Sequence, residues 1–116
     1  MITMIKTLWI KDEYLQQILA GRKTIEVRVG YSNIRKLKVG DILLLNDDYR
    51  FIIRRIGSYA SFEELLRNED LMHIAPDLDP EQLLPEMQNL YPPEKEALGV
   101  FALEVAPENV AVDPRP

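Results

Sequence analysis

The spacing of apolar residues changes from a helical to a strand period within residues 12–30, and this change limits the fold more than any other feature. Residues 12–21 carry apolar side chains at helical spacing and end in Gly21, a residue typical of helix C-termini. Residues 23–30 (KTIEVRVG) alternate instead, with branched apolar residues on one face and Thr24, Glu26 and Arg28 on the other. A helix followed directly by a half-covered strand indicates a mixed α and β fold.

The rest of the chain extends this pattern to the order strand, helix, three strands, two helices and strand. Residues 4–10, 41–46, 49–60 and 99–105 are rich in branched or aromatic side chains and predict strands, the first of them buried and including Trp9. Ser61, with Glu64 three residues later, forms a capping box that predicts a helix over 61–69, and Asp79 before Pro80 predicts another over 79–91. We expect "APDLDP" to be a turn and "YPPEKEALG" a loop. The order favours an α+β fold, a small barrel-like sheet with helices at one side.

Composition limits the class of protein further. A chain of 116 residues fits one compact domain, and the absence of cysteine excludes disulfides, zinc fingers and thiol nucleophiles. No apolar run approaches the roughly 18 residues that span a bilayer, and the N-terminus does not resemble a signal peptide. We expect a soluble, cytoplasmic, unprocessed monomer without contact with a membrane, with one domain over 1–105 and a Pro-rich tail over 106–116.

Charge is distributed unevenly along the chain. The net charge is −5, which argues against indiscriminate binding to nucleic acid. Residues 21–55 nevertheless hold nine Lys and Arg against four Asp and Glu, whereas residues 61–116 hold three against thirteen. This asymmetry predicts a local basic surface on an acidic molecule.

The junction of the first helix and the second strand concentrates side chains that can handle a polar ligand. Lys23 follows the turn at Gly21, and the alternation puts Glu26 and Arg28 on one strand face, with their backbone attachments about 7 Å apart. Arginine offers a rigid fork of donors, glutamate an acceptor or base, and a buried lysine a base or nucleophile. The alternative is a solvent-facing strand whose ion pair contributes about 0.2–1 kcal/mol.

These residues carry a resemblance to a known family. "GRKTIEVR", as Gly21-x-Lys23-x-x-Glu26-x-Arg28, resembles the G-x-K-x-x-E-x-R signature of the ASCH domain family, relatives of the PUA and EVE RNA-binding domains. The segments "LKVGDILLL", "SFEELL" and "LYPPEKEALGVFALEV" resemble small prokaryotic ASCH proteins in order and spacing. The resemblance covers residues 4–105. It implies a PUA-like small β-barrel with flanking helices, and a cleft at Lys23, Glu26 and Arg28 for RNA or a modified nucleoside.

Some small members of the family resemble amidohydrolases that deacetylate N4-acetylcytidine with a lysine, a threonine three residues later and a downstream glutamate. Lys23 matches the lysine, but the residue three positions on is Glu26, and Thr24 is the nearest hydroxyl. Asp77, Asp79 and Glu81 are candidates for the downstream acid. A carboxylate in place of the hydroxyl would favour general-base activation of water over nucleophilic attack.

Further candidates surround the motif. A basic loop with an aromatic residue can hold phosphate and stack a base. Arg54 and Arg55 are adjacent on a predicted strand, so they should face opposite ways and one of them could join the cleft. His73, the single histidine, is expected to be a packed or turn residue, and we expect no metal and no cofactor. The candidate ligand-binding residues are Gly21, Arg22, Tyr31, Arg35, Lys36, Lys38, Tyr91 and Glu96.

Three functions remain open from the sequence. The first is a domain that binds RNA or a modified nucleoside. The second is a small amidohydrolase or nuclease in which Lys23, Glu26 and Arg28, with Thr24 as a weaker candidate, are catalytic. The third is an adaptor whose acidic helices in 61–91 meet a protein partner.

Overall fold

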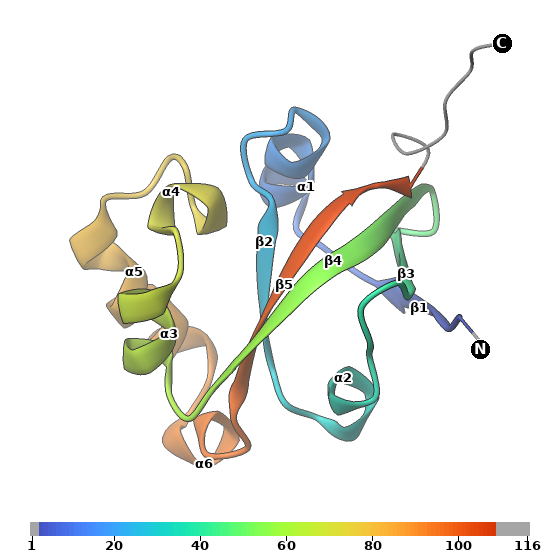
Figure 1. The fold of residues 1–116 in the computed structure, drawn as a ribbon. Coiled ribbons are helices and arrows are strands. Elements are labelled where there is room, and N and C mark those ends of the chain that lie inside the picture. Colours follow the sequence, from blue (N-terminus) through green and yellow to red (C-terminus); the bar gives the residue numbers. More distant parts are fainter. Residues whose placement is uncertain (1–2, 109–116) are drawn as a thin grey trace, which may run out of the picture.

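The computed structural model describes residues 3–108, and within them five strands form one twisted sheet of order β1-β3-β4-β5-β2 (Figure 1). The pairing of β1 with β3 is parallel, and the other pairings are antiparallel. Because β1 and β2 occupy the two ends of this order, the sheet is a half-barrel that stays open between them. The strands are β1 (Ile5–Leu8), β2 (Ile25–Val29), β3 (Ile42–Leu45), β4 (Tyr49–Tyr59) and β5 (Val100–Pro107).

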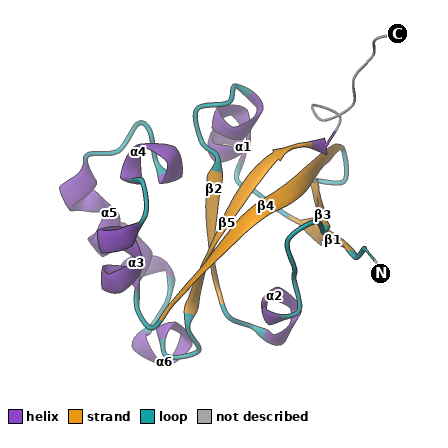
Figure 2. Ribbon diagram, in the orientation of Figure 1, coloured by secondary structure: helices purple, strands orange, loops and turns teal. Residues whose placement is uncertain are grey.

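Helices cover both faces of the sheet. Helices α3, α4 and α5 lie together on one side, next to β2 and β5, whereas α2 lies on the other side, toward β3 (Figure 2). Within residues 3–108 no helix is long and apolar enough to cross a membrane. The helices are α1 (Asp12–Leu19), α2 (Ser32–Arg35), α3 (Phe62–Asn68), α4 (Leu71–Ile74), α5 (Pro80–Leu90) and α6 (Pro93–Glu96).

Strand β5 joins two hydrophobic cores because both of its faces are buried. Val100 and Ala102 pack into the core beneath α3 and α5, whereas Leu103 and Val105 pack into the half-barrel with residues of α1 and β3. A strand buried on both faces is apolar on both, which explains the sequence VFALEV. The partner of β5 at the edge, β2, therefore has a fixed register, with Glu26 opposite Leu103 and Arg28 opposite Phe101.

The order of elements confirms the predicted α+β fold, with three differences. "PEKE" forms the short helix α6, where a loop was expected, and "LMHI" forms the short helix α4, which was not predicted; the turn expected at "APDLDP" follows α4. The start of α4 is capped by Asp70, whose Oδ1 accepts from the Met72 N–H at 3.1 Å. Strand β5 continues to Pro107, into the predicted tail, and residues 109–116 of that tail lie outside the described part of the chain.

The prediction of a buried strand over 4–10 is wrong in its burial and in its end. Strand β1 stops at Leu8, and Trp9 is 67% exposed. The side chain of Asn46 bonds both the N–H of Ile10 at 2.7 Å and its carbonyl at 2.9 Å, so the chain leaves the sheet there. Strand β1 is also an edge strand, which leaves part of it open to solvent and exposes Ile5.

Candidate functional site

A cavity of about 300 Å³ lies beside the free edge of β2. Its walls come from the β1–α1 loop, α1, β2, and the helical side of the fold, α3 to α5. Three residues predicted from the motif, Lys23, Glu26 and Arg28, line it together, and so does the predicted Tyr91. The other lining residues are Trp9, Ile10, Lys11, Tyr14, Val27, Phe62, Ile74, Ala75, Leu78, Leu83, Glu86, Met87 and Leu90.

Lys23 is a buried cation, only 5% exposed. The turn at Gly21, which has a φ of +81°, ends α1 and directs the chain back, so that the N–H of Lys23 bonds the carbonyl of Gln17 at 3.1 Å. The Nζ atom donates to the carbonyl of Ile25 at 2.7 Å and to that of Ile74 at 2.8 Å, and lies 3.4 Å from Oε1 of Glu26. Two of the three N–H donors of the ammonium group are thus used by backbone carbonyls, and the charge is paired with Glu26.

Burial lowers the pKa of Lys23 from its ordinary value, while the neighbouring Glu26 acts in the opposite direction. The ring of Tyr14 lies 5.9 Å from Nζ and adds a cation–π contact. Lys23 thus ties β2 to α4 at the base of the cavity and presents Glu26, not its own amine, to a ligand.

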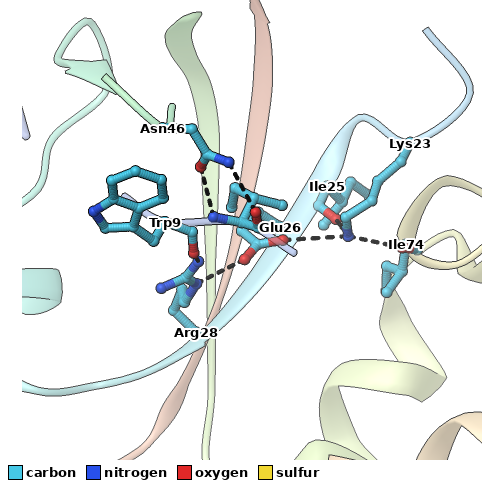
Figure 3. A network of polar contacts seen from close by, with 8 residues as sticks. Trp9, Lys23, Ile25, Glu26, Arg28, Asn46 and Ile74 are labelled. Atoms are coloured by element: carbon cyan, nitrogen blue, oxygen red, sulfur yellow. Dashed lines mark hydrogen bonds and ion pairs between the residues drawn. The ribbon is translucent and has the colours of Figure 1, made fainter. Parts of the chain in front are cut away.

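Glu26 and Arg28 form the second half of this polar network (Figure 3). Oε2 of Glu26 accepts from Nε of Arg28 at 2.6 Å, and Nη2 of Arg28 donates to the backbone carbonyl of Trp9 at 2.9 Å. Because Trp9 follows β1, Arg28 bridges the gap where the half-barrel is open. The carboxylate of Glu26 lies between two cations, and Arg28 is held in place at both ends of its guanidinium.

The free edge of β2 adds main-chain groups to the cavity. Val105 N–H bonds the Thr24 carbonyl, and Gly30 N–H bonds the Gly99 carbonyl, so the even-numbered residues of β2 point their backbone groups at β5. The odd-numbered residues point theirs away, as the bond from Lys23 to the Ile25 carbonyl shows. The N–H and carbonyl of Val27 therefore face the open edge, where Val27 lines the cavity.

The opposite wall is apolar and aromatic. Tyr91 is partly exposed and packs on Phe62, which is fully buried, with ring centroids 5.9 Å apart, and Leu83 and Met87 of α5 are also buried. Burial raises the pKa of Tyr91, so its phenol stays protonated near neutral pH and can donate a hydrogen bond. The cavity combines an apolar wall that includes the ring of Tyr91 with a charged base.

Comparison with known proteins agrees with the motif. The model of the family described as "ASCH domain" matches residues 8–109. The chain belongs to the ASCH domain family. No curated protein matches it.

Two solved structures share the ASCH fold of this chain, a PUA-like small barrel with flanking helices. The crystal structure of hypothetical protein PH0355 is 30% identical, with a TM-score of 0.84, and the match covers 90% of this chain and 99% of that one. The solution NMR structure of protein PF0455 from Pyrococcus furiosus is 29% identical, with a TM-score of 0.75, and the match covers 90% and 98%.

Three predicted site residues of the ASCH motif, Gly21, Arg22 and Thr24, do not line the cavity. Arg22 points to the surface and pairs with Asp77 at 2.8 Å, and Asp77, a candidate downstream acid, does not line the cavity. The N–H of Thr24 bonds the carbonyl of His73 at 3.0 Å, and its own carbonyl is used by β5. His73 itself is exposed beside Asp70 on α4.

The basic loop that follows the ASCH motif also lies outside the cavity. Arg35 donates to the carbonyl of Gly30 at 3.1 Å and to that of Leu98, so it ties α2 to the start of β5. Lys36 and Lys38 are exposed on the surface. Tyr31 is partly exposed and lies under the ammonium of Lys95, 5.4 Å from its ring centroid.

The remaining predicted polar residues have structural partners. Oε2 of Glu96 accepts from the N–H of Phe62 at 2.8 Å, so Glu96 caps the start of α3 and does not face the cavity. The register of β4 shifts between Ile53 and Arg55, both Arg54 and Arg55 are exposed, and neither lines the cavity. Arg55 pairs with Glu69 and Glu104, away from the cavity.

The sequence interpretation missed several residues of the cavity. Trp9, Tyr14 and Glu86 line the cavity, although none of them belongs to the predicted site. Asp79 and Glu81, which are candidates for the downstream acid, do not line it. Glu86 falls on the same helix as buried Leu83 and Met87, so its position relative to that apolar face was the available signal. Within residues 3–108 no group of His, Asp or Glu side chains is placed to hold a metal ion.

Proposed function

We propose that this ASCH domain binds RNA or a modified nucleoside by enclosing one base in the cavity beside β2. The observation that carries this proposal is the combination of the partly exposed ring of Tyr91, which packs on the buried ring of Phe62, with a fixed polar base at Glu26 and Arg28. Proteins that read single-stranded RNA stack an unstacked base on aromatic rings and bond its polar edge. A volume of about 300 Å³ is at the small end of ligand sites and suits a group of this size.

The polar groups at the base of the cavity match the edge of a nucleobase. The N–H and carbonyl of Val27 supply one donor and one acceptor side by side, Glu26 supplies an acceptor, and Arg28 supplies donors. Every base presents donors or acceptors on its edge, and one that lacked the right pattern would leave buried groups of the protein unpaired. Because these groups are fixed by the network around Lys23, their pattern would be selective.

Local charge supports a nucleic acid ligand in spite of the acidic chain. Lys11, Lys23 and Arg28 line the cavity against Glu26 and Glu86, so its surroundings carry a small positive excess while the whole chain carries −5. Lys36 and Lys38 on the exposed face around α2 are candidates for further phosphate contacts.

Hydrolysis of an acylated nucleoside is a second candidate, because a buried lysine with a lowered pKa beside a carboxylate is typical of reactive sites. The geometry favours binding over this reaction. Lys23 donates to two backbone carbonyls and pairs with Glu26, so its amine would have to leave these carbonyls to act as base or nucleophile. Glu26 is the better placed of the two groups to activate a water molecule.

Binding of short single-stranded RNA at low salt tests the proposal. We expect Arg28→Ala to weaken binding at least about tenfold, because it removes one charged donor and releases Glu26. Arg54→Ala is the matched control, an exposed arginine outside the cavity, and should change affinity much less. The affinity should also fall linearly with the logarithm of salt concentration. Equal effects of the two substitutions, or no binding of any RNA or nucleoside, would remove the proposal.

The hydrolytic candidate has its own measurement. The protein is incubated with N4-acetylcytidine, and the products are separated by chromatography. Release of cytidine by the native protein, but not by Glu26→Gln, would establish the reaction. Unchanged substrate over hours, together with measurable binding, would exclude hydrolysis and support binding as the function.

A further inference from the structure

We infer that Trp9 is a stacking platform for the base next to the one in the cavity, so that the preferred ligand is a single-stranded nucleotide chain and not a free nucleoside. This inference rests on the proposed function. It adds a second subsite, at a residue that lies outside the ASCH motif.

The first observation is that Trp9 is both exposed and held in place. Its side chain is 67% exposed although it lines the cavity. Its backbone carbonyl accepts from Arg28, and the next residue, Ile10, has both its N–H and its carbonyl bonded by Asn46 (Figure 3). A large indole on a fixed backbone leaves apolar surface in water and loses little freedom when a ring stacks on it.

The second observation is the composition of the mouth of the cavity. Leu90, at the end of α5, also lines the cavity and is 71% exposed. One base inside the cavity would cover Tyr91 but would leave the exposed surfaces of Trp9 and Leu90 in solvent. A neighbouring base of the same strand would cover them, because stacking on an aromatic side chain is open to every base.

The third observation is the charge beside Trp9. Lys11, two residues later, is exposed and lines the cavity, and the guanidinium of Arg28 bonds the carbonyl of Trp9 itself. The phosphate that joins the two bases would lie between these cations. A free nucleoside has no phosphate and would not use them.

Fluorescence provides a direct test because Trp9 is the single tryptophan of the chain. The full chain is titrated with hexauridylate, hexacytidylate and hexaadenylate, and separately with uridine, cytidine and adenosine. Trp9→Ala and Trp9→Phe are compared with Tyr49→Ala, an exposed aromatic residue that does not line this cavity. Affinities of the variants without tryptophan are measured by fluorescence anisotropy of labelled oligonucleotides, and those of the nucleosides by NMR.

We expect an oligonucleotide to quench the fluorescence of the native protein. Trp9→Ala should weaken its binding at least about fivefold, the lower limit for base–aromatic stacking, whereas Trp9→Phe and Tyr49→Ala should retain most of it. Trp9→Ala should weaken nucleoside binding much less than oligonucleotide binding, because a nucleoside does not occupy the second subsite. If Trp9→Ala left the oligonucleotide affinity unchanged while Arg28→Ala lowered it, this inference would be overturned and the proposed function would remain. Equal losses for nucleoside and oligonucleotide would also overturn it, and absence of all binding would remove both proposals.

Discussion

Replacement of Lys23 by methionine tests whether this lysine is a structural cation. The substitution keeps the length of the side chain and removes the ammonium group. It leaves the carbonyls of Ile25 and Ile74 without their donor in a buried place, and Glu26 without one of its two cations. Each unsatisfied buried group costs about 1–3 kcal/mol, and part of this is offset because no charge is desolvated any more. We expect the free energy of unfolding to fall by about 2–4 kcal/mol.

Urea denaturation followed by circular dichroism measures this loss. Lys36→Met is the matched control, because Lys36 is exposed, and it should change the free energy of unfolding by no more than about 0.5 kcal/mol. If Lys23→Met were as stable as the native protein, the three contacts of Nζ would not hold β2 against α4. Lys23 would then be available for chemistry, contrary to the reasoning above.

The pH dependence of stability is a second consequence of the burial of Lys23. Burial lowers its pKa below the ordinary 10.5, so just below pH 10.5 the unfolded chain binds more protons at this residue than the folded protein does. Raising the pH through that range therefore adds stability. Tyrosines with a raised pKa lower the stability of the fold over the same pH range. Their contribution is the same in Lys23→Met, so it cancels when the native protein is compared with this variant. The advantage of the native protein over this variant should grow toward pH 10.5, and a constant difference would contradict the prediction.

Three further substitutions test other parts of the fold. Arg55 lowers the pKa of the buried Glu69 carboxylate, so the ionised carboxylate stabilises the fold, and this stabilisation disappears as the pH falls through that pKa. Glu69→Gln should therefore lower the free energy of unfolding at pH 7 and make it less dependent on pH in acid. Urea denaturation at several pH values measures both effects. Asn46→Ala should lower the free energy of unfolding by about 2 kcal/mol in the same assay, since it removes both bonds to Ile10 and places alanine at a φ of +51°. Asn46→Gly should lower it less, because glycine tolerates this φ but also lacks the two bonds. Ser61→Ala should cost about 1 kcal/mol by loss of the cap of α3, and an unchanged thermal midpoint would contradict it.

Local patterns in the sequence predicted what depends on neighbours along the chain. Alternation in 23–30 placed Glu26 and Arg28 on one face of β2, and the structure has them on one face, 2.6 Å apart at their closest atoms. The helix stop at Gly21 and the capping box at Ser61 are also local signals, and both features are present.

Features that depend on distant segments could not be predicted in this way. The burial of Lys23 requires the carbonyl of Ile74, which is 51 positions away, and lysine is rarely buried in proteins. The exposure of Trp9 depends on Asn46, which lies in the turn between β3 and β4. Its side chain bonds the backbone of Ile10, just after β1 ends. Arg35 is a predicted ligand-binding residue, but in the structure its guanidinium donates to the backbone carbonyls of Gly30 and Leu98.

The short helices α4 and α6 illustrate a different limit. Each has four residues, about one turn, so no apolar period can be recognised in them. Helix α4 nevertheless supplies a wall of the cavity through Ile74. The cleft therefore could not be outlined from the sequence, although the charged residues at its base could.

The most direct measurement of the central claim is an amide and indole NMR titration of the native protein with a short single-stranded RNA. The claim that the cavity encloses a base predicts that the largest shifts fall on the amides of Glu26, Val27 and Tyr91, and that they disappear in Arg28→Ala. Shifts gathered instead around Tyr49 and Phe51, at the second hollow of the surface, would contradict it.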